Sequence, residues 1–142
     1  MALTLADAIA SAACNTIVDA ADGANPARIR LYSGARPAGP DTAPAGTLLA
    51  EFTLGSTAFG AAASGVATLD VSTPRVTVGL ADNTATWWRL LTHAQATGTG
   101  LGLVDGSVSA AGGGGDMIAS TTAVTTGGSV EITAGTITVP MA

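Results

Sequence analysis

The sequence contains no lysine, so its five basic residues are all arginine, and charged residues make up only 11% of the 142 residues. Soluble domains usually carry about a quarter charged residues. Mixed surface charge keeps free molecules apart, so one interpretation is that partners cover much of this surface. A genome rich in G and C would produce the same composition. The net charge of −5 disfavours nucleic acid as a partner, because phosphate binding requires clustered basic residues.

Cysteine and long apolar runs are also scarce. Cys14 is the single cysteine, which excludes an intrachain disulfide. No run approaches the roughly 18 apolar residues that a membrane helix needs, and the first residues lack the basic lead of a secretory signal. We therefore expect a soluble protein with no membrane partner, and a length of 142 residues predicts a single compact domain.

Both tryptophans lie in one segment, residues 84–92, with the sequence TATWWRLLT. Side chains alternate along a strand, so Trp88 and Leu90 would share one face and Trp87 and Leu91 the other. A strand that is apolar on both faces is expected at the centre of a sheet. One face would meet the core, and a helix, a loop or a neighbouring subunit would cover the other.

Helical periodicity predicts one N-terminal helix, over residues 4–21. Thr4 would cap its start, and Gly23 and Pro26 would stop it. The helix and its linker would occupy residues 1–26, and a β-domain residues 27–142. The helix would lie on the sheet or tether the chain to another subunit. Its expected apolar stripe is Leu5, Ile9, Ala12, Ala13, Ile17 and Ala20.

The remaining chain predicts short strands separated by turns rich in Gly and Pro. Thr73-Pro74 would end strand pairing, and Gly127-Gly128 and Ala134-Gly135 would form hairpin turns. About eight or nine short strands are typical of an antiparallel β-sandwich or a jelly-roll-like barrel. The fold class is therefore mainly β with one N-terminal helix. The expected core contains Phe52, Leu54, Val78, Trp88, Leu90, Ile132 and Val139. The expected strands span residues 28–32, 47–54, 66–71, 75–80, 84–92, 101–108, 117–120, 129–133 and 136–141.

Residues with catalytic chemistry are isolated from one another in the sequence. His93 has no carboxylate beside it, and Cys14 would need that histidine as its base to act as a nucleophile. Residues 112–115 are glycine but lack the Lys-Ser/Thr of a phosphate loop. Asp105-Gly106 is a turn signal without the alternating acids of a calcium loop. We therefore expect no enzyme, no cofactor and no metal site.

Three arginines form the one basic cluster of this acidic chain. Arg28 and Arg30 share a strand face, and Arg36 follows in the next loop. Arginine pairs bidentately with carboxylates, so the cluster could dock a carboxylate-rich partner. It could equally be a solvent-facing group paired with acidic residues of the same chain.

Five segments carry a resemblance to a known family. They are RIRLYSGARPAGPDTAPAGTLLAEFTL, an AF pair, TATWWRLL, DGSV and the closing VEITAGTITVP. In this order they resemble small proteins of tailed-phage and prophage head modules. The pattern covers most of the chain after the helix. The chain departs from it at Ser107-Val108-Ser109, where the family often has QG, and in the long glycine run at residues 112–115.

The resemblance implies a virion structural protein, and within that class a decoration, or cement, protein. Such a protein would be made in the host cytoplasm, bind the outer surface of the major capsid protein shell and bridge its subunits as a homotrimer. We expect Leu5, Ile9, Arg28, Arg30 and Arg36 to contact the capsid. The expected trimer contacts are Trp87, Leu91, Gly113 and Met117.

Three alternatives stay open at this point. Another virion part, such as a tail-tube, head–tail joining or fibre protein, would form a six-fold ring or a long thin trimer. A carbohydrate-binding sandwich would need exposed aromatic residues in a groove. An enzyme would need a pocket that brings His93 to an aspartate or to Cys14.

Overall fold

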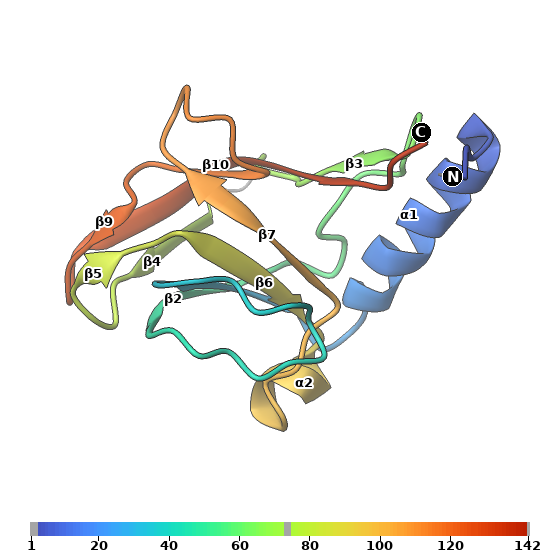
Figure 1. The fold of residues 1–142 in the computed structure, drawn as a ribbon. Helices are drawn as coiled ribbons and strands as arrows, with labels where there is room; N and C mark the ends of the chain where they lie inside the picture. The colour runs from blue at the N-terminus through green and yellow to red at the C-terminus, as the bar shows by residue number, and fades with distance from the viewer. Residues whose placement is uncertain (1–2, 73–74, 142) are drawn as a thin grey trace.

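The computed structural model describes residues 3–72 and 75–141. The expected break at Thr73-Pro74 lies outside the described residues. The fold is mainly β, as predicted, with a curled eight-stranded sheet and one long helix beside it (Figure 1). The helices are α1 (Asp7–Ala21) and α2 (His93–Thr97). The strands are β1 (Arg28–Tyr32), β2 (Leu48–Thr53), β3 (Val66–Thr68), β4 (Arg75–Val78), β5 (Asn83–Thr84), β6 (Trp87–Leu91), β7 (Val104–Ser109), β8 (Met117–Ala119), β9 (Ala123–Val124) and β10 (Ser129–Thr138).

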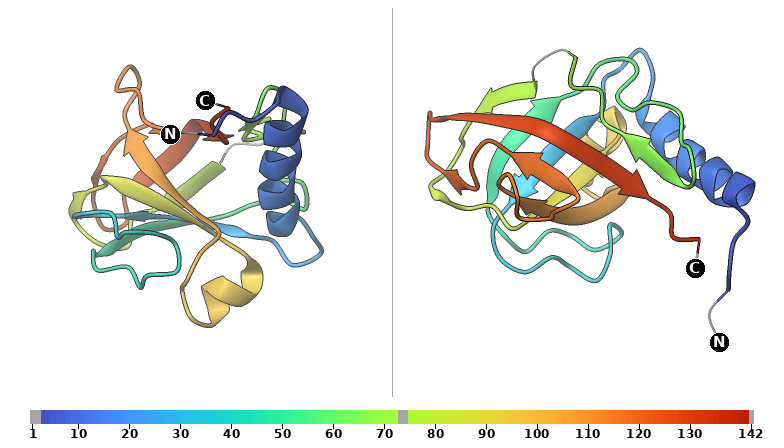
Figure 2. Two further views of the ribbon diagram at one scale, coloured as in Figure 1. Left: turned by 45° about the vertical axis from the view of Figure 1, so that its right-hand side comes forward. Right: turned by 90° about the horizontal axis from the view of Figure 1, so that it is seen from above.

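The sheet curls far enough to resemble a barrel. Its strand order is β2-β1-β6-β7-β8-β10-β3, and β4 also pairs with β10. The N–H of Leu80, just after β4, donates to the carbonyl of Leu49 in β2 at 2.8 Å, which links the two ends of the curl. α1 lies beside β3, at the end of the molecule away from β5 and β9 (Figures 1 and 2).

The tryptophan strand lies at the centre, as the sequence predicted. β6 pairs with β1 on one side and β7 on the other, both antiparallel. All five of its residues are buried. Trp88 and Leu90 belong to the main hydrophobic core, while the alternate residues of β6 are buried on the opposite face of the sheet.

The predicted core is correct except at the rim of the barrel. Phe52, Leu54, Trp88, Leu90 and Ile132 are all buried in it, and Val139 packs against it while partly exposed. Val78 was predicted wrongly, because its side chain is 54% exposed. β4 turns Arg75 and Thr77 toward the interior, so the two valines of the strand face outward.

Two predictions about the strands are wrong. Ala134-Gly135 is not a turn, because β10 continues through it as one strand of ten residues. Gly135 lies against the end of the Met117 side chain, which a Cβ at this position would displace. The sheet is also mixed, because β7 and β8 pair in parallel at Val108 and Met117.

The N-terminal helix is present but starts later than predicted. It begins at Asp7 after the N-cap residue Ala6, and no side chain caps it. Thr4 lies in an extended arm that Leu5 ties to the C-terminal segment, through an N–H···O bond of 2.7 Å to Met141.

The predicted buried face of the helix is also wrong. The buried residues are Ala10, Cys14, Val18 and Ala21, whereas Ile9 is 57% exposed. Polar contacts fix this rotation, because Ser11 Oγ accepts the N–H of Gly65 at 3.1 Å and Asn15 Oδ1 accepts the N–H of Ala62 at 2.7 Å. The helix therefore packs on its own subunit.

Helix α2 was not predicted, although the sequence carries its signal. Thr92 Oγ1 accepts the N–H of Gln95 at 3.2 Å, and Gln95 Oε1 accepts the N–H of Thr92 at 2.9 Å. This reciprocal capping box follows the Thr-x-x-Gln pattern. No helix in the described part of the chain is long and apolar enough to cross a membrane.

Candidate functional site

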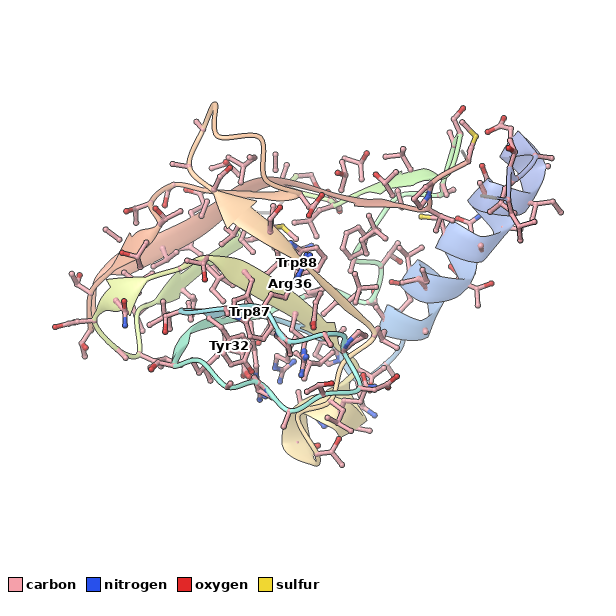
Figure 3. The ribbon with its side chains drawn as sticks, in the orientation of Figure 1. Tyr32, Arg36, Trp87 and Trp88 are labelled. Atoms are coloured by element: carbon pink, nitrogen blue, oxygen red, sulfur yellow. The ribbon has the colours of Figure 1, made fainter. Side chains whose placement is uncertain are left out.

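The face of β1 and β6 that points away from the main core carries an aromatic pair. Trp87 on β6 lies opposite Tyr32 on β1, and their rings stack with centroids 4.5 Å apart and planes 13° from parallel (Figure 3). Trp87 Nε1 donates to the carbonyl of Ser33 at 3.3 Å. The guanidinium of Arg89 lies 5.4 Å from the Trp87 ring centroid, within the range of a cation–π interaction.

Beside this pair runs a row of four charged residues, which we call the charge row. Glu51, Arg30, Arg89 and Asp105 lie directly opposite one another on β2, β1, β6 and β7. The two arginines are neighbours in the middle, and each has its own carboxylate outside it. Arg30 Nε lies 2.6 Å from Glu51 Oε2, while Arg89 donates to both oxygens of Asp105, at 2.6 and 2.8 Å.

The two arginines of the charge row differ in how deeply they are buried. Arg89 has no exposed surface, so its bidentate pairing offsets a large desolvation cost. For Arg30, desolvation disfavours the charged form, but the hydrogen bond and charge of Glu51 outweigh it and raise the pKa of Arg30. The row is therefore a fixed internal charge network.

The same arginines hold the covering segments onto the sheet. Arg89 donates to the carbonyls of Gly39, at 3.3 Å, and Gly100, at 3.2 Å. Arg30 donates to the carbonyl of Ala96 in α2 at 2.8 Å. The loop of residues 33–47, helix α2 and the turn after it thus close over Trp87 and Arg89. We call this side of the sheet the closed face.

The predicted basic docking patch does not exist as an open surface. Arg28 and Arg30 both pair with Glu51, and their side chains are 18% and 16% exposed. The alternative left open by the sequence, pairing within the chain, is the correct one for these two. Arg36 differs, because it is exposed and forms no hydrogen bond or ion pair with any described residue.

Most of the predicted trimer contacts are wrong for a similar reason. Trp87, Leu91 and Met117 are buried inside the subunit and have at most 1% of their surface exposed. They cannot offer a contact to a second copy in this conformation. Only Gly113 of the four lies on the surface, in the loop between β7 and β8.

The candidate chemical groups are held in structural surroundings. Cys14 is fully buried and its thiol donates to the carbonyl of Ile137 at 3.4 Å. Burial raises the pKa of the Cys14 thiol, which disfavours the reactive thiolate. His93 is the first residue of α2, and its Nδ1 is buried without a described hydrogen-bond partner. Within residues 3–72 and 75–141, no three His, Cys, Asp or Glu side chains form a group able to hold a metal.

Hollows in the described surface include three that involve the residues considered above. One, of about 410 Å³, is lined by Arg36, Thr86, Trp87, Ser107 and Asp116 together with Gly34. A second, of about 300 Å³, lies between the end of α1 and the start of α2 and includes His93. A third, of about 110 Å³, lies between β7 and β10 and shares Asp116 with the first.

Apolar side chains are exposed on two other parts of the surface. Val76, Val78 and Leu80 form a row along β4 and its continuation, each a little over half exposed. We call this row the open face. At the other end of the molecule, Leu3 and Ile9 are exposed on the arm and first turn of α1. Val71 and Met141 are also exposed, but less so.

The comparisons with known proteins provide no further guide: no family model, curated protein or solved structure matches the chain. Any functional assignment therefore depends on the residues themselves. Arg89 and Asp116 matter most among those that the sequence did not single out. Asp105 was predicted to lie in a turn, but it lies within strand β7. An arginine inside an apolar strand was the available signal for Arg89, because a buried charge must be paired.

Proposed function

We propose that the chain is a virion structural protein, a decoration protein of a tailed-phage capsid. It would bind the outer surface of the major capsid protein shell and bridge its subunits as a homotrimer. Bridging adds contacts that must break before shell subunits separate, and three linked copies gain avidity over one. The sequence pattern in residues 28–54, 84–91, 105–108 and 130–140 motivates this assignment.

The open face is the single structural observation that carries the proposal. A contiguous row of three half-exposed aliphatic residues offers an apolar patch, and such patches can mark protein contacts. Directly opposite on β10 lie Ser129 and Glu131, so the row has one acidic neighbour and otherwise small polar ones. Permanent subunit interfaces are more apolar than transient ones, and we therefore assign the open face to the trimer contact.

The capsid-facing side would be the exposed face of α1 and its arm. Ile9 projects there and Leu5 is partly exposed at the base of the arm. Arg36 is exposed elsewhere, beside Trp87 and Asp116. The net charge of −5 suits the outer surface of a shell better than its DNA-facing interior.

Adding purified protein to undecorated capsids and imaging the particles tests the proposal. We expect stoichiometric density on the outer surface with local three-fold symmetry. Ile9→Asp should reduce this density, whereas Thr53→Asp, a charge placed on an exposed residue of β2, should not. Absence of density at saturating protein would contradict the proposal. A six-fold ring or a thin fibre in solution would favour the tail or fibre alternatives instead.

A further inference from the structure

The wall of the barrel has a narrow opening between β7 and β10. β8 separates these two strands, but it is only three residues long and pairs with β7 at just two positions. Beyond it, residues 104–107 of β7 pair with β6 on one side only, and residues 136–138 of β10 pair with β3. The Thr136 N–H donates to the Asp116 carbonyl at 2.9 Å and bridges one end of the opening. From there, β7 and β10 diverge toward the side of α1 (Figure 1).

Both strands direct backbone polar groups into the opening. The Ser107 N–H donates to the side chain of Asp116, on the edge of β7 that faces away from β6. Successive backbone groups alternate between the two edges of a strand, so the N–H and carbonyl of Asp105 point the same way. On β10, the Val139 N–H donates toward β3, and by the same alternation the N–H and carbonyl of Thr138 point into the opening. In the described chain, no backbone hydrogen bond joins β7 directly to β10.

A buried indole N–H faces the same opening. Trp88 is 1% exposed, and its Nε1 has no hydrogen-bond partner among the described residues. Trp88 lines the hollow of about 110 Å³ that lies between β7 and β10. Gly106 leaves the indole edge uncovered, because a Cβ at this position would lie 2.5 Å from Nε1. Buried polar groups are normally paired with protein or with ordered water, so this N–H requires an acceptor.

The size of the opening suits water. β8 sets β7 and β10 two strand positions apart, which leaves their facing backbone groups roughly 8 Å from each other, because one strand spacing is about 4.8 Å and a direct hydrogen bond about 2.9 Å. Two water molecules in series, with three hydrogen bonds, span such a distance. The hollow of about 110 Å³ has room for about three molecules. Cavities that stay dry have apolar walls, whereas backbone N–H and carbonyl groups line this one.

We propose that this opening is a binding site for ordered water, held as a short chain that joins β7 to β10 in place of strand hydrogen bonds. The innermost molecule accepts the Trp88 indole N–H and donates to a backbone carbonyl. Its neighbours connect the backbone groups of Asp105 and Thr138, because bridging water forms nearly as good a hydrogen bond as a direct partner. The water chain therefore completes the barrel wall where β8 ends. This site does not depend on the proposed capsid function.

Nuclear magnetic resonance cross-peaks between water and protein protons test the site on the original chain. We expect the Trp88 indole N–H, assigned with Trp88→Phe, and the amides of Asp105 and Thr138 to show water contacts of opposite sign in NOE and ROE spectra, which separates bound water from proton exchange. The second indole is a control within the same molecule. Trp87 is also 1% exposed, but its Nε1 donates to the Ser33 carbonyl at 3.3 Å, so its N–H should show no water contact.

Two further measurements make the test specific. Gly106→Ala places a Cβ against the indole and should remove the Trp88 water contact, whereas Gly39→Ala, at a glycine with open space around it, should keep it. Xenon enters dry apolar cavities, so dissolved xenon should leave the Trp88 resonances of the original chain unchanged, whether or not Gly106→Ala folds. The proposal is overturned if the Trp88 indole shows no water contact, if xenon shifts its resonances, or if a folded Gly106→Ala retains the contact.

Discussion

Large apolar side chains are buried on the closed face of this sheet and half exposed on its open face. On the closed face, Trp87 and Leu91 look like exposed contact residues by their alternation but are covered by loop 33–47 and α2. On the open face, Val76 and Val78 look like core residues by composition but remain half exposed. The closed face is sealed by arginine bonds to loop carbonyls, and nothing comparable in the described chain covers β4.

This comparison shows that an apolar face is not by itself an interface. The covering loop carries three prolines between residues 37 and 44, which limit its conformations and lower the entropy lost on ordering it. The buried Arg89 then donates to the Gly39 carbonyl of this loop, and the largely buried Arg30 donates to the Ala96 carbonyl of α2. The closed face is therefore buried within its own subunit, whereas the uncovered aliphatic row of β4 remains available to a second copy.

The largest loss of stability should occur when the buried Arg89 of the closed face loses its carboxylate partner. Asp105→Ala leaves the Arg89 guanidinium buried without its carboxylate, and breaking a buried pair in this way costs about 3–5 kcal/mol. Urea unfolding at neutral pH measures this loss. Arg89→Met combined with Asp105→Ala should recover most of the stability, because no charge is then buried alone. A loss below about 1 kcal/mol for Asp105→Ala would show that the charge row does not hold the closed face.

A smaller effect should follow from loosening the cover of the closed face. Thr92→Ala removes the N-cap acceptor of α2, which should cost about 1 kcal/mol and increase hydrogen exchange of the α2 amides. Thr92→Ser keeps the hydroxyl and serves as the matched control. Equal exchange in the two variants would argue that the arginine bonds alone hold α2 in place.

The open face should tolerate polar substitution within one subunit. Val78→Thr keeps the shape of a side chain that is already half exposed, so the free energy of unfolding should change by less than about 0.5 kcal/mol. The measurement uses dilute protein, at which subunits remain apart. A loss comparable to that of a core substitution would mean that another part of the same chain covers β4.

The smallest expected effect is a loss of stability at acid pH, and it arises at Asp82 in the turn after the open face. Asp82 Oδ1 accepts the N–H of Thr126 at 2.6 Å, and this backbone hydrogen bond lowers the pKa of Asp82. A lowered folded-state pKa gives stability that is complete above the ordinary carboxyl value near 3.8 and is lost as the pH falls through the lowered value. Asp82→Asn should remove this part of the acid dependence, as urea midpoints at neutral and acid pH would show. An unchanged acid dependence would contradict this assignment.

Local patterns predicted the central architecture well. Alternation along residues 28–32 and 84–92 correctly indicated β1 and a two-sided central β6, because the period of a strand is independent of what covers it. The capping box at Thr92 and Gln95 also carried enough information to predict α2. The assignment of Trp88 and Leu90 to the core followed from the same alternation.

The wrong predictions concern places where contacts between residues far apart in the sequence determine the structure. Gly135 suggested a turn, but its missing side chain makes room for Met117 from β8. The helix had two apolar faces, and hydrogen bonds that Ser11 and Asn15 accept from N–H groups of the loop before β3 selected the less hydrophobic one. The candidate contacts Trp87, Leu91, Arg28 and Arg30 failed because the covering segments and the partner Glu51 lie far away in sequence.

The most direct test of the account is the oligomeric state of two variants with opposite predicted outcomes. Sedimentation equilibrium should find the original chain as a trimer, Val76→Asp with Val78→Asp as a folded monomer, and Trp87→Phe still as a trimer. A trimer that survives the two aspartates on β4 but dissociates in Trp87→Phe would contradict the assignment of the closed and open faces.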